Sequence, residues 1–130
     1  MPDLSTYDYA VIRVVPRVER GEFINVGVIV SCDATGLLEA AIELDEARLL
    51  ALDPRADVAG LRAALATIPV ICAGGAAAGA LGRMGTRERF HWLVAKRSTS
   101  IQTSPVHTGR SHAPKLAIDM LMQKMVRTAG

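Results

Sequence analysis

Aromatic side chains are scarce in this sequence, which has one Trp, two Tyr and two Phe in 130 residues. Proteins that stack nucleic-acid bases need aromatic platforms, and the sequence also lacks a concentrated Lys/Arg cluster, so we do not expect nucleic-acid binding. Two cysteines cannot form a disulfide-rich secreted scaffold, which indicates a reduced, intracellular setting. Charged residues make up 22% of the chain and hydrophobic residues 50%, and this balance excludes an intrinsically disordered protein.

The N-terminus lacks the basic and apolar regions of a signal peptide, so we expect a cytoplasmic protein. One uncharged run, residues 63–82, has the length of a membrane span. Pro69 interrupts this run, and its Ala and Gly residues contribute little free energy of insertion. We therefore expect no membrane association.

Charge is unevenly distributed along the chain, although the net charge is only +2. Residues 1–80 contain 6 Arg against 11 Asp or Glu, a local charge of −5. Residues 81–130 contain 9 Lys or Arg against 2 acids, a local charge of +7, and all three histidines. This division favours an anionic partner or ligand for the second half. The alternative is that the basic half packs against the acidic half of the same domain.

The first 44 residues predict three antiparallel strands. Their β-branched and partly alternating segments, at 7–18, 23–32 and 37–44, are separated by turn residues and form a meander. Pro16 cannot donate to a β-ladder, so it indicates an edge position or the end of the first strand. Gly27, inside the second segment, indicates a β-bulge or a close backbone approach.

The rest of the chain is predominantly helical in pattern. Asp45 is placed to cap the first helix, and the second has a single apolar stripe. We expect helices at 45–54, at 57 to between 68 and 73, at 86–95 and at 113–127, with a flexible glycine-rich loop at 74–85 and an extended stretch at 98–104. The prediction is one α+β domain over residues 1–130, an N-terminal antiparallel β-meander packed against about four helices.

The sequence contains no complete motif for a cofactor, a metal or a nucleophile. The stretch 74–85 has neither the Gly-Lys-Ser/Thr of a phosphate loop nor dinucleotide-binding spacing. Cys32 and Cys72 lie 40 residues apart, and the spacing of His107 and His112 is a weak match to a zinc site. Neither His91 nor His107 belongs to an H-x-T/S motif. We predict no cofactor, no metal and no catalytic residue, and we favour a non-catalytic protein over an enzyme.

Residues 86–109 contain the strongest candidate for a binding site. His91 follows Arg87 by four positions, so on a helix they share one flank. Guanidinium, imidazole, hydroxyl and free backbone N–H groups are typical of a phosphate or carboxylate site. The alternative is a solvated helix flank followed by a capped loop. The candidate side chains are Arg87, Arg89, His91 and Lys96 on or just after the helix, and His107 and Thr108 in an expected loop at 104–109.

Asn25 is the remaining candidate, because asparagine is disfavoured in the middle of a strand. Its amide requires a hydrogen-bond partner. That partner is either a ligand or partner chain, or the local backbone of a bulge at Gly27.

Three separated segments resemble a known family: YDYAVIRVVPRVERGEFINVGVIV at 7–30, IELDEARLLALDP at 42–54 and RFHWLVAKRSTSIQTSPVHTG at 89–109. In this order they are similar to the bacterial family catalogued as domain of unknown function 3037, over nearly the whole chain. The resemblance implies a small, single-domain bacterial protein with no assigned activity and no catalytic residues to carry over. It also implies a HipA-like protein kinase as partner, because genes of the family often lie beside one for such a kinase.

From these observations we expect an accessory or interaction module of a bacterial cytoplasmic system, whose basic half meets an acidic partner surface or a phosphorylated ligand. The alternative is an enzyme or a binding protein for a phosphorylated small molecule or nucleotide. That alternative would place Arg87, Arg89, His91, His107 and Thr108 in one pocket. Pairing with a second copy, through an exposed strand edge near Pro16, is also open.

Overall fold

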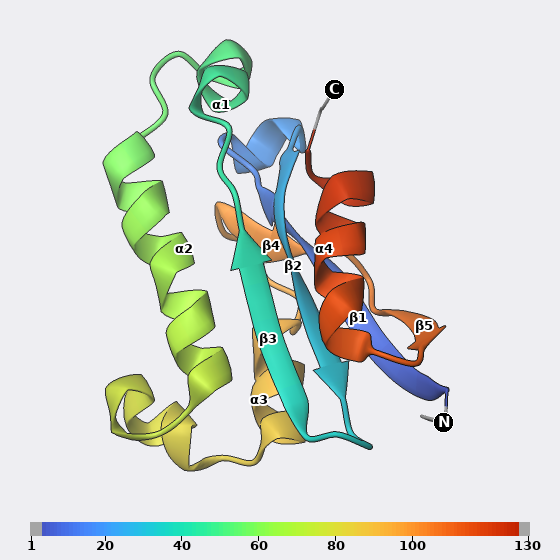
Figure 1. The fold of residues 1–130 in the computed structure, drawn as a ribbon. Coiled ribbons are helices and arrows are strands. Elements are labelled where there is room, and N and C mark those ends of the chain that lie inside the picture. Colours follow the sequence, from blue (N-terminus) through green and yellow to red (C-terminus); the bar gives the residue numbers. More distant parts are fainter. Residues whose placement is uncertain (1–3, 128–130) are drawn as a thin grey trace.

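A single antiparallel sheet of five strands organises residues 4–127, the part of the chain that the computed structural model describes (Figure 1). The strand order is β3-β2-β1-β4, and β5 pairs with β1 beside its first half. The predicted N-terminal meander is confirmed as β1 to β3. The strands are β1 (Ser5–Val14), β2 (Ile24–Cys32), β3 (Leu37–Ile42), β4 (Ile101–Thr103) and β5 (His107–Ser111).

Strand β1 lies inside the sheet, because it pairs with β2 on one side and with β4 and β5 on the other. It ends at Val14, so Pro16 marks the end of the strand, one of the two predicted meanings. The expectation of an exposed edge near Pro16 is wrong. The backbone N–H of Val15 donates to the carbonyl of Ser100 at 2.7 Å, which places the segment of β4 alongside this end of β1.

Within residues 4–127 the helices are four α-helices and two 3-10 segments, which confirms an α+β domain. Asp45 caps α1 as predicted, and Asp57 caps α2 by accepting from the backbone N–H of Gly60 at 3.0 Å. Helix α2 runs through Pro69 to the far end of its predicted range. The bounds are α1 (Glu46–Leu52), α2 (Val58–Ala73), α3 (Thr86–Leu93), α4 (Pro114–Met125), η1 (Val18–Arg20) and η2 (Ala76–Arg83).

Two loop predictions are corrected by the fold. The stretch 74–85, expected to be a flexible loop, contains η2, whose turns are broken at Gly79 where φ is 61°. The expected loop at 104–109 becomes strand β5 from His107 onward. In both segments the local composition is that of a loop. Pairing with β1, about 100 residues earlier in the chain, makes His107–Ser111 a strand.

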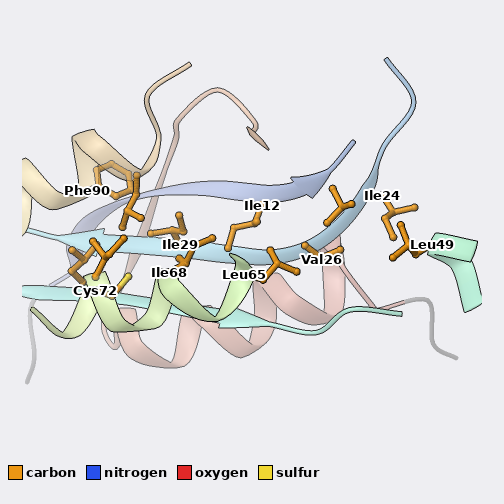
Figure 2. Close-up of a cluster of buried hydrophobic side chains, with 13 residues drawn as sticks. Ile12, Ile24, Val26, Ile29, Leu49, Leu65, Ile68, Cys72 and Phe90 are labelled. Carbon is orange, nitrogen blue, oxygen red and sulfur yellow. The ribbon is translucent and has the colours of Figure 1, made fainter. Parts of the chain in front are cut away.

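Helices cover both faces of the sheet, and each face has its own cluster of buried side chains. Helices α2 and α3 pack on one face, and Figure 2 shows Leu65 and Ile68 of α2 lying against Ile12 and Ile29 of the sheet, with Phe90 at one end of the cluster. Helix α4 covers the other face. Its cluster joins Ala117, Ile118, Leu121 and Met122 to Tyr7, Val28, Val30 and Cys32.

A β-bulge in β2 confirms the prediction made from Gly27. Ile12 pairs with Gly27, and the next residue of β1, Arg13, pairs with Asn25, so Val26 is the extra residue. A Cβ atom at position 27 would collide with the carbonyl oxygen of Ala41 on β3, so the close approach is also confirmed.

No single helix among residues 4–127 is long and apolar enough to cross a membrane. Helices α2 and η2 reach that length and composition only together, and they are bent by 62° relative to each other.

Candidate functional site

Arg87 on α3 is the predicted site residue with the strongest charge contacts. Its guanidinium lies 2.7 Å from a carboxylate oxygen of Asp8 on β1 and 3.8 Å from one of Asp33, which follows β2. Thr108 donates to the other carboxylate oxygen of Asp8 at 3.0 Å, because the two residues are directly opposite each other on β5 and β1. The structure therefore brings Arg87 and Thr108 together through Asp8. Two carboxylates beside one guanidinium disfavour a phosphate at this point.

Arg89, in contrast, is buried and holds two segments of the chain together. Its guanidinium donates to the carbonyl of Met84, before α3, and to the carbonyl of Cys72 near the end of α2, the latter at 3.3 Å. Gly74 lies directly beneath it, where a Cβ atom would be 3.0 Å from the guanidinium carbon. This side chain is committed to contacts inside the protein, in which it ties the end of α2 to the start of α3.

His107 and Thr108 are neighbours in sequence but lie on opposite faces of β5, since side chains alternate along a strand. Thr108 is on the face of Asp8, and the ring of His107 lies 5.5 Å from the ring of Tyr9 on the other face. His91 and Lys96 are exposed at α3 and just beyond it. Arg87 and Thr108 meet at Asp8, but Arg89 and His107 point elsewhere, so the five residues expected in one pocket are not gathered there.

Asn25 bonds across the domain and not to the local bulge. Its amide nitrogen donates to the carbonyl of Met125, at the end of α4, at 3.0 Å. This bond anchors the last turn of α4 to β2, 100 residues away in sequence. The amide oxygen is buried and, within the described residues, has no hydrogen-bond partner.

Neither cysteine has the environment of a nucleophile. Both are free and buried. Burial raises the pKa of the Cys72 thiol from its usual 9 to about 11, because desolvation disfavours the thiolate.

The cations of the basic half fall into two groups. Four are held by contacts within the protein: Arg87 and Arg127 by carboxylates, and Arg89 and Arg97 by backbone carbonyls. The basic half therefore packs in part on the acidic half. Arg87 pairs with Asp8 and Asp33, and Arg127 pairs with Glu43. The other cations are exposed and have no acidic partner among residues 4–127: Arg83, Lys96, Arg110, Lys115 and Lys124.

Helix α4 presents a surface that the sequence analysis did not single out. Leu116 and Met120 are 73% and 48% exposed, and with Lys124 they follow at intervals of four residues along one side of the helix. Lys115 lies in the first turn. We call Lys115, Leu116, Met120 and Lys124 the α4 surface. The sequence does contain a sign of this surface: Leu116 and Met120 each directly precede a residue of the buried face, Ala117 and Leu121, so they fall outside the helix's buried stripe.

The fold therefore defines an α+β domain whose sheet is covered by helices on both faces. Its C-terminal helix carries exposed cations and exposed apolar side chains. The family model described as a protein of unknown function (DUF3037) matches residues 9–126, and the chain belongs to this family. Neither a curated protein nor a solved structure matches the chain.

Proposed function

We propose that this chain is a non-catalytic interaction module that binds an acidic surface of a partner protein. The observation that carries the proposal is the α4 surface, where two exposed apolar side chains lie between two lysines with no acidic partner among the described residues. Exposed apolar side chains rimmed by polar residues are typical of protein–protein contacts. The lysines make the surface positively charged, and it should therefore prefer an acidic partner.

The local charge of α4 supports an acidic partner. Asp119 is the only acidic residue of the helix, and Arg127 neutralises it at 3.1 Å. Glu43 also pairs with Arg127, at 2.8 Å. Lys115 and Lys124 are therefore the uncompensated charges of this face, and a carboxylate-rich surface complements them.

The scattered positions of the candidate acid–base groups support a non-catalytic role. An acid and a base that act on the same substrate must both lie within its reach. His91 lies on α3, which packs on one face of the sheet, and His107 contacts Tyr9 on the other face. The Cys72 thiol is buried with a raised pKa, so it is a poor nucleophile.

The partner that we propose is a HipA-like protein kinase, as the family resemblance implies. The test uses the purified kinase from the same organism, titrated with the intact chain in a calorimeter at low salt. We expect binding that weakens as salt rises, since exposed charge pairs are screened. Absence of binding at low salt would overturn the proposal.

Charge reversal locates the contact. The double variant Lys115→Glu/Lys124→Glu is expected to weaken binding at least tenfold, because it replaces attraction by repulsion at both ends of the α4 surface. Arg48→Glu/Arg55→Glu is the matched control, since it makes the same change in net charge on and just after α1. Equal losses in the two variants would contradict a specific role of α4. Leu116→Ser should also weaken binding while leaving the stability within about 0.5 kcal/mol, because the side chain is exposed.

A further inference from the structure

A cleft on the other side of the sheet from α4 lies between α2, the end of α3 and the segment around β4. It has a volume of about 210 Å³. Apolar side chains form most of its wall, among them Ile68 and Ile71 of α2, Leu93 of α3 and Ile101 of β4. Trp92, 42% exposed, stands on its rim. A dry apolar cavity of about 150 Å³ accommodates benzene, so this space is suited to a single aromatic ring with a short substituent.

The cleft has one charged residue, Arg97, and no carboxylate among the described residues that line it. The guanidinium carbon of Arg97 lies 4.4 Å above the centre of the Trp92 ring, a cation–π contact that holds it at the rim. Two of its N–H groups donate to the carbonyls of Leu93, at 3.0 Å, and Trp92, at 2.6 Å. A guanidinium has further N–H donors, which remain for a ligand.

Four neutral side chains of the wall already donate one hydrogen bond each. Each donates to a backbone carbonyl: the hydroxyls of Thr67 to Ala64 at 2.7 Å, Thr99 to Ile101 at 2.9 Å and Thr103 to Val94 at 3.4 Å, and the amide of Gln102 to Thr99 at 2.9 Å. Arg97 carries the one charge among the described residues of the wall, so it is the group that favours a negatively charged ligand.

From the apolar wall, the volume and this single cation, we infer that the cleft binds a small aromatic carboxylate. The ring lies against Ile68, Ile71 and Leu93, and the carboxylate accepts hydrogen bonds from Arg97 at the rim. This site is independent of the proposed function, because it lies on the face covered by α2 and α3 and shares no residue with the α4 surface.

Trp92 is the only tryptophan of the chain, so its fluorescence reports on this cleft alone. The experiment is a titration of the intact chain with phenylacetate and, separately, with the neutral phenylacetamide. We expect a saturable change in emission with phenylacetate and binding about tenfold weaker for the amide, since a hydrogen bond to a charged group is stronger than a neutral one. No saturable change with either compound, or equal affinities for both, would overturn the inference.

Two variants place the ligand. Ala64→Leu adds a side chain at an exposed position of α2 that lines the cleft, and it should abolish the fluorescence change. Ala59→Leu, exposed in the first turn of the same helix and outside the cleft, is the control and should bind as the unchanged chain does. Unchanged binding by Ala64→Leu would contradict the site.

Arg97→Gln tests the charge. It should bring the affinities for the acid and the amide to the same value. Because Arg97 also caps α3 by donating to two carbonyls, the thermal unfolding of the Arg97→Gln variant is measured in parallel. If this variant does not fold, the comparison of the acid with the amide on the unchanged chain still decides the question. A retained preference for the acid in a folded Arg97→Gln would exclude Arg97 as the selecting group.

Discussion

At the scale of single residues, the structure gives different roles to arginines that the sequence alone does not distinguish. Arg87 and Arg89 are two positions apart on α3. Arg87 is 40% exposed in its side chain and pairs with carboxylates, whereas Arg89 is buried and bonds to two backbone carbonyls. The difference arises because helical residues two apart point in different directions. Arg87 points toward β1 and the turn after β2, and Arg89 points toward the end of α2.

Arg89→Met is expected to destabilise the domain by about 2–4 kcal/mol, because it leaves the carbonyls of Cys72 and Met84 without their donor in a buried setting. The measurement is the free energy of unfolding in urea. Arg83→Met, at an exposed cation near the end of η2, is the control and should change it by no more than about 0.5 kcal/mol. Equal stability of the two variants would show that the buried guanidinium is not a structural tie.

At the scale of elements, the bulge in β2 sets which side chains reach which face. Before the bulge, Ile24 and Val26 belong to the cluster under α2, and after it Val28 and Val30 belong to the cluster under α4. Strict alternation would place Val26 and Val28 on the same face. The extra residue therefore moves Val28 and Val30 to the face of α4, while Ile29 between them belongs to the cluster under α2.

Gly27→Ala should destabilise the domain by about 1–3 kcal/mol, because the added methyl group meets the backbone of Ala41 and the side chains of Ile12 and Ile42. Chemical denaturation measures the loss. Gly85→Ala is a matched control at the N-cap of α3, where φ is −65° and the nearest atom to a new Cβ lies at 3.9 Å. A loss as large at position 85 as at position 27 would contradict the close approach of Gly27 to β3.

At the scale of the whole molecule, ion pairs join the acidic first part of the chain to the basic second part. Arg87 meets Asp8 and Asp33, and Arg127 meets Glu43, all with partly exposed side chains. Exposed pairs of this kind contribute roughly 0–1 kcal/mol each. The two apolar clusters, and not the charges, hold the molecule together.

Raising NaCl from about 50 mM to about 500 mM is therefore expected to change the free energy of unfolding by less than about 1 kcal/mol. Binding of the proposed acidic partner should be lost over the same range, since the proposed contact with the lysines of the α4 surface depends on screened charge. Urea unfolding and calorimetric binding at both concentrations make the comparison. A loss of several kcal/mol in stability would mean that charge pairing holds the two parts together, and the salt sensitivity should then disappear in Arg87→Gln/Arg127→Gln.

Local signals predicted much of the fold. The β-branched segments of the meander, Asp45 as a cap and Gly27 as a bulge all depend on neighbours in sequence or on backbone geometry, and all are confirmed. Strand β5 was missed because His107–Ser111 has no strand-like composition, and pairing with β1 makes it a strand. The candidate site was predicted only in part: Arg87 and Thr108 meet, but through Asp8, which lies far away in sequence.

The sequence by itself determined the class of the domain, the positions of most helices, the uneven charge and the family. The first three follow from periodicity, capping chemistry and composition, which act over a few residues, and the family follows from the resemblance of three sequence segments. Tertiary structure alone decided which cations are neutralised, which apolar residues of α4 are left exposed, and that Trp92 and Arg97 share a cleft with α2. The physical reason is that charge compensation and burial depend on distances between residues tens of positions apart, and only the packing of helices on the sheet sets those distances.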